Sequence, residues 1–95
     1  MEKWKGKIAV VTGASSGIGA SIFVDLARNG VTVIGMSRNL AKIDQLIINS
    51  GLERAKAYSY RCDVSDMESV KRAFIWLEEK FGFINILINN AGIGR

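Results

Sequence analysis

The sequence contains one cysteine, Cys62, and no apolar run that approaches the ~20 residues required to span a bilayer. A single cysteine excludes an intrachain disulfide, so the chain lacks the framework that stabilises many small secreted proteins. Residues 1–7 are polar, and the apolar run after them stops at Thr12, which is too short for a signal peptide. We therefore expect a cytoplasmic protein that does not associate with membranes.

The chain also lacks a basic stripe or a long run of like charges. Its 13 basic and 9 acidic residues give a formal net charge of +4, but they are scattered, and the one cluster is Lys3, Lys5 and Lys7. Nucleic-acid-binding domains gather their positive charge on one face, so we predict no nucleic-acid partner. Apolar residues make up 48% and charged residues 23% of the 95 residues, which is typical of one small globular domain. No metal site is predicted.

Apolar runs alternate with amphipathic segments along the whole chain. The runs predict strands at residues 8–11, 31–36, 55–62 and 84–88, and the segments predict helices at residues 20–29, 39–49 and 65–81. Such alternation is typical of βαβ units, which form an α/β, Rossmann-type parallel sheet. Right-handed crossovers then predict the strand order 3-2-1-4, with a ligand site at the switch point between the first and fourth strands.

Local signals define the predicted helix ends. Asn39 is the expected N-cap of the second helix, and Ser65 with Glu68 forms the capping box expected to open the third. The three helices are expected to stop at Gly30, Gly51 and Gly82. The apolar face of the third helix is predicted to contain Val70, Ala73, Phe74, Leu77 and Phe81, with Ile75 and Trp76 facing outward.

A glycine-rich turn follows the first predicted strand. Gly13 permits a sharp exit from that strand, and Gly17 and Gly19 keep the backbone open to a ligand at the start of the helix. The unpaired N–H groups and the dipole at a helix start favour a phosphate. No Gly-Lys-Ser/Thr follows, so the turn is not a P-loop. The alternative is a tight strand-to-helix connection that binds nothing.

No carboxylate stands at the end of the second predicted strand, where the chain has Ser37, Arg38 and Asn39. In dinucleotide-binding folds an acidic residue there binds the ribose 2′-hydroxyl of NAD, whereas an arginine accommodates the 2′-phosphate of NADP. Arg38 can bind that phosphate through a forked, charge-assisted pair, with Ser37 adding a hydroxyl and Lys42 a further cation. The alternative is that Arg38 and Lys42 are ordinary solvated surface residues.

The motifs together resemble the short-chain dehydrogenase/reductase family. Its T-G-x-x-x-G-x-G turn matches residues 12–19, and Ser37-Arg38, Cys62-Asp63-Val64-Ser65 and Asn89-Asn90-Ala91-Gly92 stand in the family's order and spacing. The surrounding sequence, including residues 4–7, is most similar to the NADP-dependent farnesol dehydrogenase-like group. The resemblance favours an adenine contact for Asp63, whose simpler alternative is a turn aspartate that caps its own backbone. Cys62 is expected to be a buried strand residue.

The resemblance implies an NADP-binding site and a function. The family transfers hydride between a nicotinamide and an alcohol or carbonyl substrate. The cofactor-binding residues expected here are Gly13, Ser15, Ser16, Gly17, Ile18, Gly19, Ser37, Arg38, Asn39, Asp63, Val64, Asn90, Ala91 and Gly92.

The family's catalytic tyrosine, followed four residues later by a lysine, has no match in this sequence. Cys62 and Val64 stand four residues after the two tyrosines, Tyr58 and Tyr60, so no catalytic residue is assigned. Family chains are about two and a half times this length. Residues 1–95 are therefore expected to form one incomplete domain, the NADP-binding half of a doubly wound fold, which binds its small-molecule substrate only in the full-length form and is inactive alone.

Three hypotheses remain open from the sequence. The chain is a truncated oxidoreductase, a stand-alone nucleotide-binding module without catalysis, or an interaction module that completes its sheet against a partner. The fourth predicted strand would form an unprotected sheet edge, so we also expect self-association through it. The residues expected at this edge are Ile84, Ile86, Leu87 and Ile88.

Overall fold

A computed structural model describes residues 6–15 and 17–90. Strands and helices alternate throughout this part of the chain, as predicted. In order, they are β1 (Ile8–Thr12), α1 (Gly17–Arg28), β2 (Thr32–Ser37), α2 (Leu40–Asn49), β3 (Ala57–Arg61), α3 (Met67–Phe81) and β4 (Ile86–Asn89).

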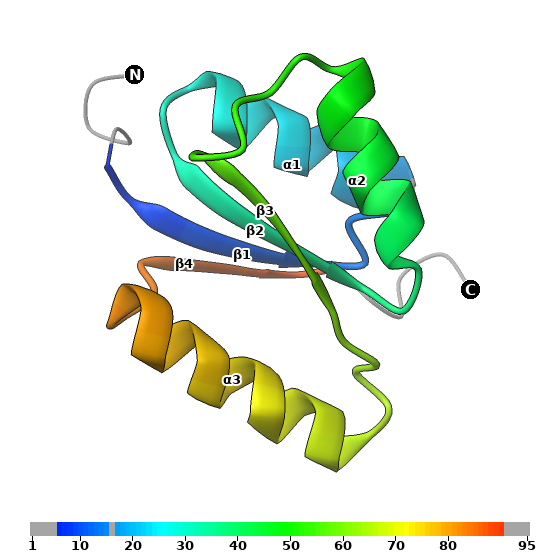
Figure 1. Cartoon of the computed structure of the whole chain (residues 1–95), viewed down its shortest axis with the longest axis vertical. Helices are drawn as coiled ribbons and strands as arrows, with labels where there is room; N and C mark the ends of the chain where they lie inside the picture. Colours follow the sequence, from blue (N-terminus) through cyan, green and yellow to red (C-terminus); the bar gives the residue numbers. More distant parts are fainter. Residues whose placement is uncertain (1–5, 16, 91–95) are drawn as a thin grey trace.

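The strands form one parallel sheet in the order β3-β2-β1-β4, which confirms the predicted topology. Helices α1 and α2 cover one face of this sheet and α3 covers the other (Figure 1). The central strand β1 pairs with β2 on one side and with β4 on the other, with Val10 opposite both Ile34 and Leu87. The switch point therefore lies between β1 and β4, as the order 3-2-1-4 requires.

The core has two parts, one on each face of the sheet. Successive β1 residues alternate between them, with Ala9 and Val11 facing α1 and α2 and Val10 facing α3. This double burial explains why β1 and β2 are nearly continuous apolar runs. Each fully buried Val, Ile, Leu or Phe side chain contributes about 1.5–3 kcal/mol to folding, so these two layers dominate the stability.

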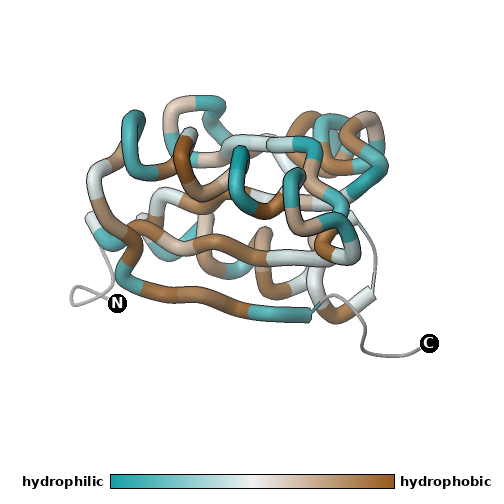
Figure 2. Tube along the Cα trace, turned by 90° about the horizontal axis from the view of Figure 1, so that it is seen from below, coloured by the Kyte–Doolittle hydropathy of each residue, from teal (hydrophilic) through white to brown (hydrophobic). Residues whose placement is uncertain are grey.

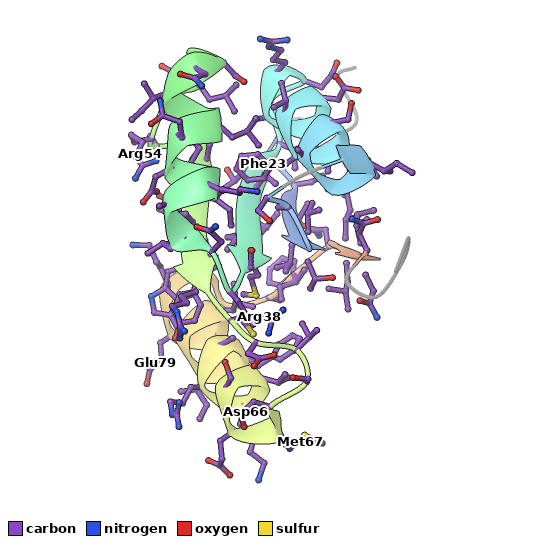
Figure 3. All side chains as sticks on the ribbon, turned by 90° about the vertical axis from the view of Figure 1, so that its right-hand side faces the viewer. Phe23, Arg38, Arg54, Asp66, Met67 and Glu79 are labelled. Atoms are coloured by element: carbon purple, nitrogen blue, oxygen red, sulfur yellow. The ribbon has the colours of Figure 1, made fainter. Side chains whose placement is uncertain are left out.

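Phe23 joins α1 to the sheet because β2 has a glycine beneath it. Phe23 is fully buried, and Figure 3 shows it between α1 and α2. A Cβ added to Gly35 would lie 2.9 Å from Phe23 Cε1 and 3.1 Å from Ala14 Cβ. The missing side chain therefore lets the ring pack directly on the backbone of β2.

Several element boundaries differ from the predicted ones. Strand β3 begins at Ala57, because residues 54–56 form a turn in which Glu53 O accepts hydrogen bonds from Lys56 N and Ala57 N, both at 2.9 Å. Strand β4 begins at Ile86, and Asn85 Oδ1 accepts a hydrogen bond from Ile8 N at 2.8 Å. Helix α1 begins at Gly17, three residues before the predicted start, so its first N–H groups lie within the glycine-rich turn.

Two predictions for α3 were wrong. Its N-cap is Asp66, whose side chain accepts from Glu68 N at 3.1 Å, and the hydroxyl of Ser65 donates instead to Asp63 Oδ1 at 2.6 Å. Trp76 packs inward against Tyr60, with ring centroids 4.4 Å apart, whereas Phe74 is 43% exposed. Trp76, which the periodicity placed on the outer face of α3, thus packs inward because Tyr60 of β3 provides an aromatic partner.

Strand β4 forms one edge of the sheet, and β1 is the strand it pairs with in the described part of the chain. Figure 2 shows it as an apolar segment along the margin of the molecule. Its side chains alternate between half-buried and exposed, and Leu87 is 55% exposed. None of the helices in residues 6–15 and 17–90 combines the length and the apolar character needed to cross a membrane.

Replacing Gly35 by alanine is expected to destabilise the fold by about 1–3 kcal/mol, because the new methyl group would overlap the Phe23 ring. Denaturant unfolding monitored by circular dichroism measures this change. In a Phe23→Leu background the smaller side chain leaves room, so the Gly35→Ala substitution should cost less there. An equal cost in both backgrounds would contradict this explanation.

Candidate cofactor-binding site

The glycine-rich turn lies at the carboxyl end of β1, between β2 and β4. Gly13 and Gly17 both have positive φ angles, 63° and 60°, which residues with a Cβ rarely adopt. Ala14 N donates to Met36 O at 3.3 Å, which fixes the turn to the end of β2. The predicted sharp exit from β1 at Gly13 is thereby confirmed.

Gly19 permits a close contact inside the site. A Cβ at Gly19 would overlap the carbonyl oxygen of Gly13 and lie 2.5 Å from Asn90 Nδ2. A Cβ at Gly17, by contrast, would meet nothing within 4 Å. The two glycines thus have different functions: Gly19 allows α1 to pack against the turn, whereas Gly17 leaves open space in front of the start of α1.

The hydroxyl of Thr12 joins the turn to the end of β4. Thr12 is 8% exposed, and its Oγ1 accepts from Asn90 N and donates to Asn89 Oδ1, both at 3.0 Å. Asn90 Nδ2 in turn donates to Gly13 O at 3.2 Å. Asn90 was a predicted site residue, but Thr12 was not. The sequence signal that could have identified Thr12 is its place as the first residue of the T-G-x-x-x-G-x-G motif.

Serine side chains join the same turn to the end of β2. Ser37 Oγ donates to Ser15 Oγ at 3.1 Å and accepts from Asn39 N at 3.0 Å. Asn39 Oδ1 accepts from Lys42 N at 3.3 Å, so Asn39 is the N-cap of α2, as predicted. The hydroxyl proton of Ser37 is therefore directed to Ser15 in this structure.

Arg38 is exposed and lies just beyond the end of β2, near the start of α2 (Figure 3). No ion pair or hydrogen bond of its side chain is found within residues 6–15 and 17–90. Asn39 and Ser37, the predicted neighbours at this site, lie on either side of it.

Asp63 follows β3 and has the turn function that the sequence left open. Its Oδ1 accepts from Ser65 N at 3.0 Å and from the Ser65 hydroxyl. The hydrogen bond from the Ser65 side chain is the main reason that the pKa of Asp63 lies below its ordinary value, and the charges of Arg38 and Arg61 lower it further. Val64, beside it, is 47% exposed.

The described residues of the predicted site therefore lie together at the carboxyl ends of the strands. Gly13, Ser15, Gly17, Ile18 and Gly19 surround the start of α1, and Ile18 is 65% exposed. The residues that follow β2, β3 and β4 lie at the same ends of the strands. Three of the predicted residues, Ser16, Ala91 and Gly92, lie outside the described residues.

Replacing Thr12 by valine is expected to lower the free energy of unfolding by about 1–3 kcal/mol, because Asn90 N would lose its buried acceptor. Valine has nearly the same shape as threonine, so this substitution tests the hydroxyl group alone. Thr12→Ser keeps the hydroxyl and removes one methyl group, so it should cost about 0.8 kcal/mol. Denaturant unfolding compares the two variants, and a larger loss for serine than for valine would contradict this function of the hydroxyl.

The sequence is similar to known dehydrogenases and reductases. A family model described as short chain dehydrogenase matches residues 7–95. Farnesol dehydrogenase of Aedes aegypti is 46% identical over 96 residues, which cover 100% of this chain and 39% of that protein. Human dehydrogenase/reductase SDR family member 11 is 36% identical over 97 residues, covering 100% of this chain and 37% of that one.

Solved structures agree with the sequence matches. A short chain dehydrogenase from Bacillus anthracis superposes with a TM-score of 0.85 at 30% identity, over 93% of this chain and 35% of that chain. Menthone neomenthol reductase from Mentha piperita superposes with a TM-score of 0.79 at 38% identity, over 92% of this chain and 32% of that chain. The chain thus spans less than two fifths of the length of these relatives. With its family model matched from residue 7 onward and its sheet superposing on theirs, the chain belongs to the short-chain dehydrogenase family.

Proposed function

We propose that residues 1–95 are the NADP(H)-binding half-domain of an oxidoreductase that interconverts alcohols and carbonyl compounds. The observation that carries the cofactor preference is Arg38, an exposed guanidinium without a protein partner in the described part of the chain, at the end of β2. Neither of its neighbours, Ser37 and Asn39, is acidic. The site would therefore attract a 2′-phosphate, where an acidic residue would repel it.

The start of α1 would bind the pyrophosphate. Its first turn contains no acidic residue, its N–H groups begin within the glycine-rich turn, and the space in front of Gly17 is open. The positive end of the helix dipole favours an anion at this place. Ser15 and Ile18 would border the same ligand, together with Ser16.

The rest of the cofactor would extend along the carboxyl ends of the strands. Asp63 uses Oδ1 for Ser65, which leaves Oδ2 to accept the exocyclic amine of adenine beside Val64. On the opposite side of the turn, Asn90 would lie toward the nicotinamide ribose, followed by Ala91 and Gly92. When bound, the cofactor would supply hydride-transfer chemistry.

The two tyrosines of the chain do not take part in this site. Tyr58 packs edge-to-face against Phe81 with centroids 5.2 Å apart, and Tyr60 packs on Trp76. Both therefore belong to the α3 side of the core. The acid/base group and the substrate-binding surface would be contributed by other residues of the complete enzyme. The relatives' names, farnesol dehydrogenase and menthone neomenthol reductase, support a small alcohol or carbonyl substrate. The proposed location is the cytoplasm.

We expect the chain to bind NADPH about ten- to a hundredfold more tightly than NADH, which corresponds to one charge-assisted pair between Arg38 and the 2′-phosphate. Isothermal titration calorimetry with each cofactor measures the ratio. Arg38→Asp should reverse the preference, whereas Arg72→Asp, at an exposed position on α3, serves as the matched charge control. Equal affinities in the unmodified chain would disprove the NADP preference.

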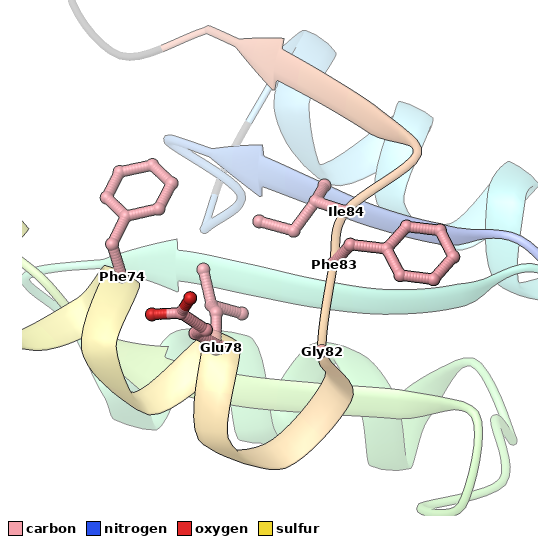
Figure 4. Close-up of a pocket in the computed structure, with 6 residues that line it drawn as sticks. Phe74, Glu78, Gly82, Phe83 and Ile84 are labelled. Atoms are coloured by element: carbon pink, nitrogen blue, oxygen red, sulfur yellow. The ribbon is translucent and has the colours of Figure 1, made fainter.

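We further propose that the isolated polypeptide associates with a second copy through the free edge of β4. Beside β4, a hollow of about 230 Å³ opens between the end of α3 and the following segment (Figure 4). Apolar side chains, including Phe74, Phe83 and Ile84, line it together with the carboxylate of Glu78, and Phe83 is 69% exposed. The hollow and the side of β4 that has no strand partner among residues 6–15 and 17–90 together form a surface that a second strand would cover.

Leu87→Lys is expected to shift the isolated chain toward the monomer, because a charge on an edge strand opposes strand pairing. Light scattering across micromolar concentrations compares it with Ile48→Lys, a substitution at a 68% exposed position on α2. The control should associate like the unmodified chain. A monodisperse monomer of the unmodified chain at all concentrations would refute association through β4.

A further inference from the structure

Arg61 lies beside the proposed 2′-phosphate site, although it is 23 positions from Arg38 in the chain. In the parallel pairing of β2 with β3, Arg61 stands opposite Ser37. The hydrogen bond from Cys62 N to Ser37 O, at 3.0 Å, keeps the two strands together up to their ends. Paired residues of neighbouring strands direct their side chains to the same face of a sheet.

The alternation along β3 shows which face this is. Ala57 packs in the core under α1 and α2, and the Ser59 hydroxyl donates to Asp44 of α2 at 2.5 Å. Tyr58 and Tyr60 face α3. Arg61 therefore continues the series of Ala57 and Ser59 on the α2 side, the side on which Ser37 contacts Ser15 of the glycine-rich turn.

Like Arg38, Arg61 is exposed and has no hydrogen bond or ion pair within the described ranges 6–15 and 17–90. The positive charges of both arginines lower the pKa of Asp63, which indicates that both guanidinium groups lie near its carboxylate. Asp63 accepts its hydrogen bonds from Ser65 rather than from either arginine. Two guanidinium groups thus border the end of β2 with their donors free.

We propose that Arg61 is a second specificity-determining residue, which binds the 2′-phosphate of NADP(H) together with Arg38. This inference depends on the proposed function, because it concerns the same adenosine site. A dianionic phosphate has three terminal oxygens, so two guanidinium groups can bind it at once from neighbouring strands. Arg38 would approach from the end of β2 and Arg61 from the outer side, on β3.

The test compares 2′,5′-ADP with 5′-AMP, two probes that differ only in the 2′-phosphate. Arg61→Ala is expected to weaken the binding of 2′,5′-ADP by about fivefold, the effect of one exposed ion pair, and to leave 5′-AMP unchanged. Arg61→Lys should restore part of the loss, and added salt should reduce the difference between variants. Arg72→Ala is the matched control, since it removes an exposed arginine from α3.

The outcomes distinguish a failure of this inference from a failure of the proposed function. If the unmodified chain prefers 2′,5′-ADP and Arg38→Ala but not Arg61→Ala lowers that preference, the inference about Arg61 is wrong and the proposed function stands. If the unmodified chain binds both probes equally, both are wrong. An equal loss for both probes in Arg61→Ala would indicate a structural effect and would also overturn the inference. Strand β3 is the edge opposite β4, so association through β4 leaves Arg61 accessible.

Discussion

The buried hydroxyl of Thr12 is the contact on which the geometry of the site depends. At the carboxyl end of a parallel sheet the strands diverge, and backbone groups lose their ladder partners. Here the Thr12 hydroxyl accepts from one such backbone group, Asn90 N, and donates to the side-chain oxygen Asn89 Oδ1. Because Asn90 also donates to Gly13 O, the end of β4 and the glycine-rich turn are joined into one unit.

A second constraint is steric, and it acts through residues without a side chain. Gly19 allows α1 to approach Gly13 and Asn90, and Gly35 allows Phe23 to pack on β2. These close contacts set the position of α1, while Ser37 and Ser15 hold the other side of the turn. The polar groups that shape the turn are thus paired with one another, whereas Arg38 and Arg61 have no hydrogen bond or ion pair within residues 6–15 and 17–90.

Much of this arrangement could be predicted from the sequence, because the signals are local. The apolar runs of β1 and β2, the stops at Gly30, Gly51 and Gly82 and the N-cap at Asn39 all depend on a few adjacent residues. Periodicity could not show that Trp76 turns inward, since its partner Tyr60 belongs to another element. Ser65 and Asp66 are both residue types that cap helices. Asp66 is the N-cap of α3, because the Ser65 hydroxyl donates to Asp63 instead. Likewise, Arg61 lies beside Ser37 only through the pairing of β3 with β2.

The strand order also determines when the site can assemble. Residues of β1 and β2 that pair are 24 positions apart, as Ile8 and Thr32 are, whereas Thr12 and Asn89 are separated by 77. Closing the longer loop costs about 1 kcal/mol more conformational entropy than closing the shorter one. The nascent sheet can therefore form β1, β2 and β3 while β4 is still unpaired, and Thr12 gains Asn89 and Asn90 only when β4 docks. In folding kinetics, we therefore expect the contacts of Thr12 with Asn89 and Asn90 to be among the last native contacts to form.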